Sequence, residues 1–337
     1  MRNTTHSPLH IRSVDDVITV LPHLLGFRPT DSLVVMIVGP RTCPAAGLVA
    51  RMDLPAMASP EGFRAGVGSL EACHPGTDLL FVVFTDDIPT GQQVLREGLS
   101  SLRCSRVLDA VVTDGSSWWG IDEEEGHPVV DDGRAAAEAI YRGLSVLPDR
   151  AALARTVAGP GPEPRPEDAE LFDESWRMLR EMTLPDLFDL ADTLLAAPTM
   201  EEDEPGPHPA GIDALTAVHL ARMLELPMIQ IALWQGTERA DARRLVDLWK
   251  QVLHHCPDHL AGPVLGLCGL AAWLCGDGAT TSVCLERGGE LECIDALLLG
   301  ALDVVHRSML PPEAWDALER DPYVIVETAP VARDGAA

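Results

Sequence analysis

The stretch DLLFVVFTDDIPTGQQVLREGLSSLRCSRVLDAVVTDG, residues 78–115, decides the fold class of the first half of the chain. It contains an apolar run at residues 79–84, a helical pattern at 92–102 and a predicted strand, VLDAVV, at 107–112. Strand, helix and strand in this order form a βαβ unit, whose two strands are parallel. Strands buried on both faces of a sheet are apolar throughout, as LLFVVF is. We therefore expect an α/β domain.

A helix is predicted to begin at Ser13, before the sheet. Ser13 and Asp16, three residues later, form a variant capping box for the first backbone amides of a helix. Apolar residues follow with the spacing of one buried stripe, although Pro22 should kink the last turn. Gly26 supplies the left-handed residue that ends a helix, and Pro29 prevents its continuation.

An apolar run at residues 33–38 and the alternating stretch LVARMDL at 48–54 both indicate strands. Their short connection contains Gly and Pro, which predicts an antiparallel hairpin. A helical pattern at 59–73 then leads into the βαβ unit. The sequence therefore predicts a mostly parallel sheet with a leading hairpin, over residues 10–157.

The second half of the chain is predicted to be an all-α domain, because helical patterns follow one another without strand signals. One helix pair, residues 264–288, loosely resembles a tetratricopeptide-type hairpin, but three copies at a fixed period are not found. The predicted parts are a Pro- and Gly-rich linker at 158–166, a helical domain at 167–320 with a flexible acidic segment at 201–211, and a tail at 321–337.

Charge and composition exclude several classes of function. The chain has 25 basic and 52 acidic residues, a net charge of −27, which repels nucleic acid and anionic membrane surfaces. No apolar run approaches the length of a membrane span, and no signal peptide is recognised. The eight cysteines form no C-x-x-C pair. We expect a cytoplasmic protein with reduced thiols that binds neither nucleic acid nor membranes.

Four carboxylates follow predicted strands: Asp53, Asp86, Asp87 and Asp114. If these strands are parallel, all four lie at the carboxyl edge of the sheet, where α/β folds bind ligands. Carboxylates that share a site suit Mg²⁺. The alternative is that each caps its own turn or helix, which is common for Asp at such positions. Of the two, we expect caps.

Trp118 and Trp119 follow Asp114 closely and should lie at the same edge. Adjacent side chains on an extended segment point to opposite sides. We expect one Trp to fill the core, and the other to border a pocket or to be buried as well.

His254, His255, Cys256 and His259 form a second cluster of potential metal ligands. Zinc takes nitrogen and sulfur ligands, and the spacing from His255 to His259 places two residues on one helical face. Pro257 interrupts that helix, however, and His residues are favoured at helix C-termini by the helix dipole alone. We expect no structural zinc here.

Four stretches carry a resemblance to a known family: LPHLLGFRPTDSLVV (21–35), the Asp86–Asp87 pair, DAVVTDGSSWWG (109–120) and AAWLCGDGA (271–279). In this order they resemble a large family of actinobacterial proteins defined as a domain of unknown function (DUF4192). The resemblance covers roughly residues 11 to 310. It implies a soluble bacterial protein and no particular activity.

Two hypotheses of function follow. The first is a non-enzymatic binding or adaptor protein, with a small-ligand pocket in the α/β domain and a helical domain that contacts a protein partner. The second is a Mg²⁺-dependent enzyme at the carboxylate edge, acting on a phosphorylated substrate. The sequence has neither a Gly-rich phosphate loop nor an obvious catalytic base, which favours the first.

Overall fold

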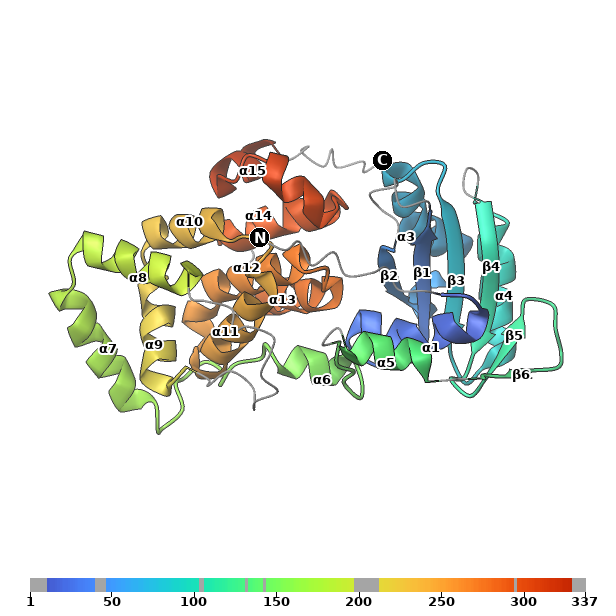
Figure 1. The fold of residues 1–337 in the computed structure, drawn as a ribbon, viewed down its shortest axis with the longest axis horizontal. Coiled ribbons are helices and arrows are strands. Elements are labelled where there is room, and N and C mark those ends of the chain that lie inside the picture. The colour runs from blue at the N-terminus through green and yellow to red at the C-terminus, as the bar shows by residue number, and fades with distance from the viewer. Residues whose placement is uncertain are drawn as a thin grey trace. The chain divides into compact units, whose positions relative to one another are not determined.

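The computed structural model describes residues 11–39, 47–102, 106–130, 133–141, 144–196, 212–293 and 296–328. The chain divides into two compact units, residues 1–152 and 153–337 (Figure 1). The division precedes the linker predicted at 158–166. The flexible segment predicted at 201–211 lies outside the described residues.

Unit 1 is built on a six-stranded mixed sheet with the order β2-β1-β3-β4-β5-β6 (Figure 1). The fully buried positions of its central strands form much of the core. The strands are β1 (Ser32–Val38), β2 (Val49–Asp53), β3 (Asp78–Phe84), β4 (Arg106–Thr113), β5 (Ser117–Gly120) and β6 (His127–Pro128).

The α/β class and the leading hairpin are confirmed, but the prediction of a mostly parallel sheet is wrong. Within the described part of the sheet, only β3 and β4 pair in parallel. Strand β1 lies between β2 and β3 and is antiparallel to both. A continuous apolar run indicates that a strand has neighbours and is covered on both faces, and it carries no information about direction. The crossover through α3 (Pro60–Cys73) therefore joins two strands of the same direction that are not adjacent.

Helices complete unit 1. Helix α4 packs closely on the sheet because it has no side chain at Gly91, where a Cβ would lie only 2.7 Å from Val112 Cγ1. Helix α1 contacts α5 through a small core of Val20, Ala135 and Ala139. These helices are α1 (Val14–Leu25), α2 (Leu54–Met57), α4 (Ile88–Leu99) and α5 (Arg134–Tyr141).

Both predicted ends of α1 are confirmed. The Ser13 hydroxyl accepts a hydrogen bond from the Asp16 amide (3.2 Å), and the Asp16 carboxylate accepts one from the Arg12 amide (2.8 Å). Gly26 ends the helix with φ 74°. Its carbonyl accepts a hydrogen bond from the Leu147 amide (2.8 Å), so the helix end is also joined to a distant part of the unit.

The described residues of unit 2 are helical and contain no named strand. Helices α12 and α13 pack against each other, as the 264–288 pair predicts. Trp234, Trp273 and Trp315 form an edge-to-face cluster with ring centroids 5.9 and 6.0 Å apart. The elements are α6 (Arg150–Arg155), which spans the division, α7 (Ala169–Glu181), α8 (Leu184–Ala196), α9 (Ala214–Met223), α10 (Pro227–Gly236), α11 (Ala242–His255), α12 (Asp258–Leu274), α13 (Gly278–Glu290), α14 (Leu297–Arg307), a 3-10 helix (Pro312–Ala317) and α15 (Pro322–Thr328).

Part of the predicted tail at 321–337 is a helix. Helix α15 packs against α14 and buries Ile325. The Asp321 carboxylate accepts a hydrogen bond from the Tyr323 amide (2.9 Å) at its start. This local cap and the burial of Pro322 and Ile325 explain why the segment forms a helix against α14. None of the helices that the structure describes is both long enough and apolar enough to span a bilayer.

Gly26→Ala should destabilise the full chain by about 1 kcal/mol, because an L-residue with a Cβ is strained at a left-handed backbone. No atom lies within 4 Å of the added Cβ, so the effect isolates the dihedral angle. The control is Gly68→Ala within α3, where the nearest atom would be 3.8 Å away and Ala is the better helix former. Urea unfolding should show loss of stability for the first variant only, and equal midpoints would contradict the expectation.

A buried histidine should make the stability of unit 2 depend on pH. His219 is 5% exposed, and its Nδ1 lies 3.1 Å from the Ser175 hydroxyl. Burial lowers the pKa of His219 below its ordinary value of 6.5. The unfolded chain therefore takes up this proton at higher pH than the folded chain, and stability falls as the pH drops below about 6.5.

In His219→Asn, the free energy of unfolding should change less between about pH 7.5 and about pH 5.5 than in the wild type. His259→Asn, at an exposed position of the same unit, is the control. Urea unfolding at the two pH values measures the difference, and an unchanged pH dependence in His219→Asn would refute this role.

Candidate functional site

The candidate site lies at the carboxyl edge of β3 and β4. Ser32, Phe84 and Thr113 are register partners across β1, β3 and β4, so these three strands reach the same edge together. The pairing of β3 with β4 continues one residue further, since the Thr85 amide donates to the Thr113 carbonyl (3.0 Å). The residues that follow these positions therefore emerge side by side.

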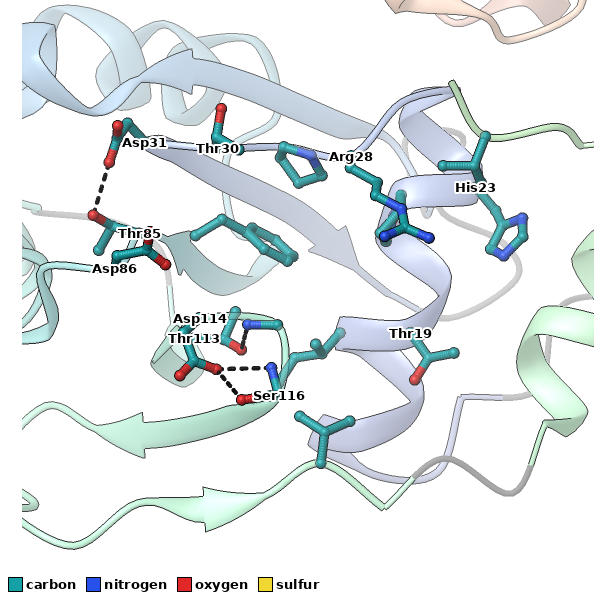
Figure 2. Close-up of a pocket in the computed structure, with 17 residues that line it drawn as sticks. Thr19, His23, Arg28, Thr30, Asp31, Thr85, Asp86, Thr113, Asp114 and Ser116 are labelled. Atoms are coloured by element: carbon teal, nitrogen blue, oxygen red, sulfur yellow. Dashed lines mark hydrogen bonds between the residues drawn. The ribbon is translucent and has the colours of Figure 1, made fainter. Parts of the chain in front are cut away.

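A cavity of about 700 Å³ opens at this edge (Figure 2). Helix α1 forms one wall, the segment that leads from α1 into β1 forms another, and the ends of β3 and β4 form the floor. The residues that line it are Ile18, Thr19, Pro22, His23, Arg28, Pro29, Thr30, Asp31, Phe84, Thr85, Asp86, Thr113, Asp114, Gly115, Ser116, Val129 and Val146.

Two carboxylates at the sheet end of the cavity differ in how they are held. Asp31 has φ 41°, an uncommon left-handed conformation for a residue other than Gly, and its Oδ1 accepts a hydrogen bond from the Thr85 hydroxyl (2.8 Å). Asp86 is exposed, and no hydrogen bond or ion pair holds its carboxylate within the described part of the chain. Asp86 is therefore free to bind a ligand.

Asp114, the third carboxylate at this end, folds its own turn. Its Oδ1 accepts hydrogen bonds from the Ser116 amide (2.7 Å), the Ser117 amide (2.8 Å) and the Ser116 hydroxyl (2.8 Å). Burial alone would raise the pKa of Asp114, but these hydrogen bonds outweigh it and hold the pKa below its ordinary value. Asp114 is thus ionised at neutral pH, and its Oδ2 is not used by the turn.

The opposite end of the cavity carries nitrogen groups. The Arg28 amide donates to the Leu147 carbonyl (3.0 Å), which fixes the backbone, while its side chain is exposed. His23 Nδ1 lies 3.4 Å from the Leu144 carbonyl. A neutral His23 ring therefore donates through Nδ1 and keeps Nε2 for other partners.

The structure does not bring the four predicted carboxylates together. Asp86 and Asp114 line the cavity. Asp53 is 69% exposed and pairs with Arg51 at 2.6 Å. Asp87 caps α4 by accepting hydrogen bonds from the Thr90 amide (3.2 Å) and hydroxyl (2.8 Å). Two of the four, Asp87 and Asp114, thus act as caps.

Neither predicted tryptophan lines the cavity, and both are half-buried, so neither fills the core as expected. Trp118 donates from Nε1 to Asp15 Oδ1 (3.1 Å), and its ring lies 4.4 Å from the His127 ring. The Trp119 ring packs over Gly126, where an added Cβ would be 2.5 Å from the ring. Both side chains hold the β4–β5–β6 end of the sheet together.

The side chains of the predicted His and Cys cluster, in unit 2, have different partners. His254 faces the Arg165 guanidinium at 2.6 Å. Burial, and then the positive charge of Arg165, lower the pKa of His254. His255 Nδ1 is bonded instead to the buried Asp168 carboxylate (2.9 Å).

The other two members of that cluster lie in different environments, one buried and one exposed. Cys256 is buried, which raises the pKa of its thiol and keeps it protonated. His259 lies in the first turn of α12 and is exposed. Across all the described ranges, no three His, Cys, Asp or Glu side chains are grouped as a metal site would require.

Sequence reasoning missed most of the cavity wall, including Thr19, His23, Arg28 and Asp31. Thr19 and His23 are four residues apart, a spacing that places two polar side chains on one face of a helix that is apolar elsewhere after Asp16. This spacing was the available signal. Nothing in the sequence shows that Arg28 shares a cavity with the ends of β3 and β4, which are far from it along the chain.

The sequence model of the family described as "Domain of unknown function (DUF4192)" matches residues 15–313. The chain belongs to this family. Neither a curated protein nor a solved structure matches it. Three of the four stretches that suggested DUF4192 in the sequence, namely 21–35, 86–87 and 109–120, contribute residues to the cavity. The cavity is therefore the candidate functional site of this DUF4192 chain.

Asp86 and Asp87 are adjacent carboxylates with different roles, and substitution should separate them. Asp87→Ala should cost about 1 kcal/mol of stability, because α4 loses its N-cap. Asp86→Ala, the matched control, should change stability by less than about 0.5 kcal/mol, because no contact in the described chain depends on it. Urea unfolding of both variants tests this, and an equal loss in each would contradict the assignment.

Proposed function

We propose that this DUF4192 chain is a non-enzymatic binding protein whose α/β unit holds a small molecule in the cavity of about 700 Å³. The observation that carries the proposal is a cavity of ligand size at the carboxyl edge of β3 and β4, with polar groups that the fold leaves unused. The Asp86 carboxylate and the Arg28 guanidinium are the principal examples.

The chemistry of the cavity wall supports binding more than catalysis. The Ser116 hydroxyl donates to Asp114, which is already engaged by two amides. His23 lies at the other end of the cavity (Figure 2). Its Nδ1 is 3.4 Å from the Leu144 carbonyl. A nucleophile and its base need to lie within hydrogen-bond reach of each other, and the described cavity residues contain no such Ser–His pair.

Of the four predicted carboxylates, only Asp86 and Asp114 line the cavity, and the alternative, a Mg²⁺-dependent enzyme, would rest on these two together with Asp31. Mg²⁺ is bound in some sites by one or two carboxylates with several waters. Asp53 and Asp87 are engaged elsewhere, so this alternative has less support than binding of an organic ligand. Mg²⁺ is nevertheless included in the experiments below.

The adaptor part of the proposal concerns unit 2. Large apolar side chains are exposed on its helices, among them Trp176, Leu184 and Met228. The α12–α13 pair, with its loose likeness to a tetratricopeptide hairpin, belongs to the same proposal, since such pairs build protein-binding surfaces. We propose a protein partner in the cytoplasm, and the net charge of −27 argues against a nucleic-acid partner.

Filling the cavity should abolish small-molecule binding. Thr19 is half-buried on α1 and lines the cavity, so Thr19→Trp should occupy the space that a ligand needs. Ligand-observed NMR with a fragment library should find fragments that bind the wild type and fail to bind Thr19→Trp. The matched control is Gln93→Trp, on the exposed face of α4.

A second cavity variant, Val146→Phe, keeps the test valid if Thr19→Trp misfolds. Circular dichroism of each variant would reveal misfolding. The proposal is supported if both cavity variants lose fragments that Gln93→Trp retains. It is overturned if no fragment binds the wild type, or if folded cavity variants keep every fragment.

A further inference from the structure

The cavity carries opposite charges at its two ends. Figure 2 shows Arg28 and His23 beside α1, well separated from Asp31, Asp86 and Asp114 at the strand ends. A ligand that complements both ends must itself carry opposite charges at its two ends. This arrangement is the basis of a more specific inference, which rests on the function proposed above.

The separation of charge is held by the fold. Asp31 is only three residues from Arg28, yet the two do not form an ion pair. The left-handed backbone of Asp31 and its hydrogen bond from Thr85 (2.8 Å) direct the carboxylate toward β3. Within the described ranges, no carboxylate lies within ion-pair distance of the Arg28 guanidinium, which is left for a ligand.

The Arg28 end suits a carboxylate. A guanidinium offers a planar fork of donors that matches the two oxygens of a carboxylate or a phosphate. The field of a chain with net charge −27, with three aspartates in the same cavity, penalises a dianion more than a monoanion. A ligand with a single negative charge therefore fits this end better than a phosphate monoester does.

The aspartate end suits an ammonium group. Asp86 offers both carboxylate oxygens, while Asp31 and Asp114 each offer the oxygen that their own hydrogen bonds do not use. Ionised carboxylates only accept hydrogen bonds, so they call for a group rich in donors. These three are not grouped closely enough for a shared metal ion, whereas an ammonium group with three donors is able to contact spaced acceptors.

We infer that the cavity binds a zwitterionic small molecule, with its carboxylate on Arg28 and its primary ammonium on Asp86. His23 and Thr19 line the wall along which the rest of the ligand lies. The inference concerns binding alone, and the ligand is released unchanged.

Isothermal titration calorimetry of the full chain with ε-aminocaproate, caproate and hexylamine tests this inference. The zwitterion should bind about tenfold more tightly than either singly charged analogue, because only it makes charge-assisted hydrogen bonds at both ends. Glycine and γ-aminobutyrate are shorter zwitterions, and 8-aminooctanoate is longer. Since Arg28 and Asp86 lie at opposite ends of the cavity, affinity should peak at the chain length that spans them.

Two variants locate the ends. Arg28→Gln should reduce the affinity for the best zwitterion about tenfold, to that of the amine alone, and Asp86→Asn should reduce it about tenfold, to that of the carboxylate alone. Arg64→Gln and Glu61→Gln, both exposed on α3 and outside the cavity lining, change the net charge by the same amounts and should leave binding unchanged.

Three outcomes would overturn the inference. The first is equal affinity for ε-aminocaproate and caproate, together with no length dependence. The second is stabilisation by Mg²⁺ alone that Asp86→Asn removes, without zwitterion binding, which would favour the metal-dependent alternative. The third is the absence of zwitterion binding, while fragments still bind the wild type and fail to bind Thr19→Trp. That result would remove the charge assignment and leave the proposed function standing, whereas the loss of both kinds of binding would remove both.

Discussion

The parallel pairing of β3 with β4 is the interaction on which the candidate site depends. It brings two strand ends to one edge and extends beyond the strands through the hydrogen bond from the Thr85 amide to the Thr113 carbonyl. The Thr85 hydroxyl then holds Asp31, which orients the chain between α1 and β1. The cavity floor, its acidic end and one of its walls thus share a single structural origin. The end of helix α1 is held by a different contact, the hydrogen bond from the Leu147 amide to the Gly26 carbonyl.

The sequence predicted much of the fold because the relevant signals are local. The capping residue Ser13 and the left-handed Gly26 each determine structure within a few residues, and both appear as predicted. The antiparallel pairing of β1 with β2, predicted from the short connection between them, is also present. The direction and order of the strands depend instead on pairing between distant segments. The placement of β1 between β2 and β3 follows from that pairing. An apolar run such as SLVVMIV is compatible with either strand direction.

The site was predictable only in part, for the same reason. The sequence pointed to the correct edge of the sheet and to Asp86 and Asp114, because Asp after a strand is a local pattern. It did not distinguish a free carboxylate from a capping one, since Asp86 and Asp87 are neighbours in the same turn and differ only in what surrounds them. Arg28 and His23 reach the cavity through the packing of α1, which no short motif encodes.

The far edge of the sheet has a consequence for association between chains. The Val129 amide donates to the Ser116 carbonyl (2.9 Å), so it points toward β5. Backbone groups alternate in direction along a strand, and the preceding Pro128 therefore faces the open side. Pro128 has no N–H, and a further strand approaching β6 would find no donor at this position. Pro128 thus disfavours the pairing of a seventh strand with the edge strand β6, which is one way in which sheets avoid edge-to-edge aggregation.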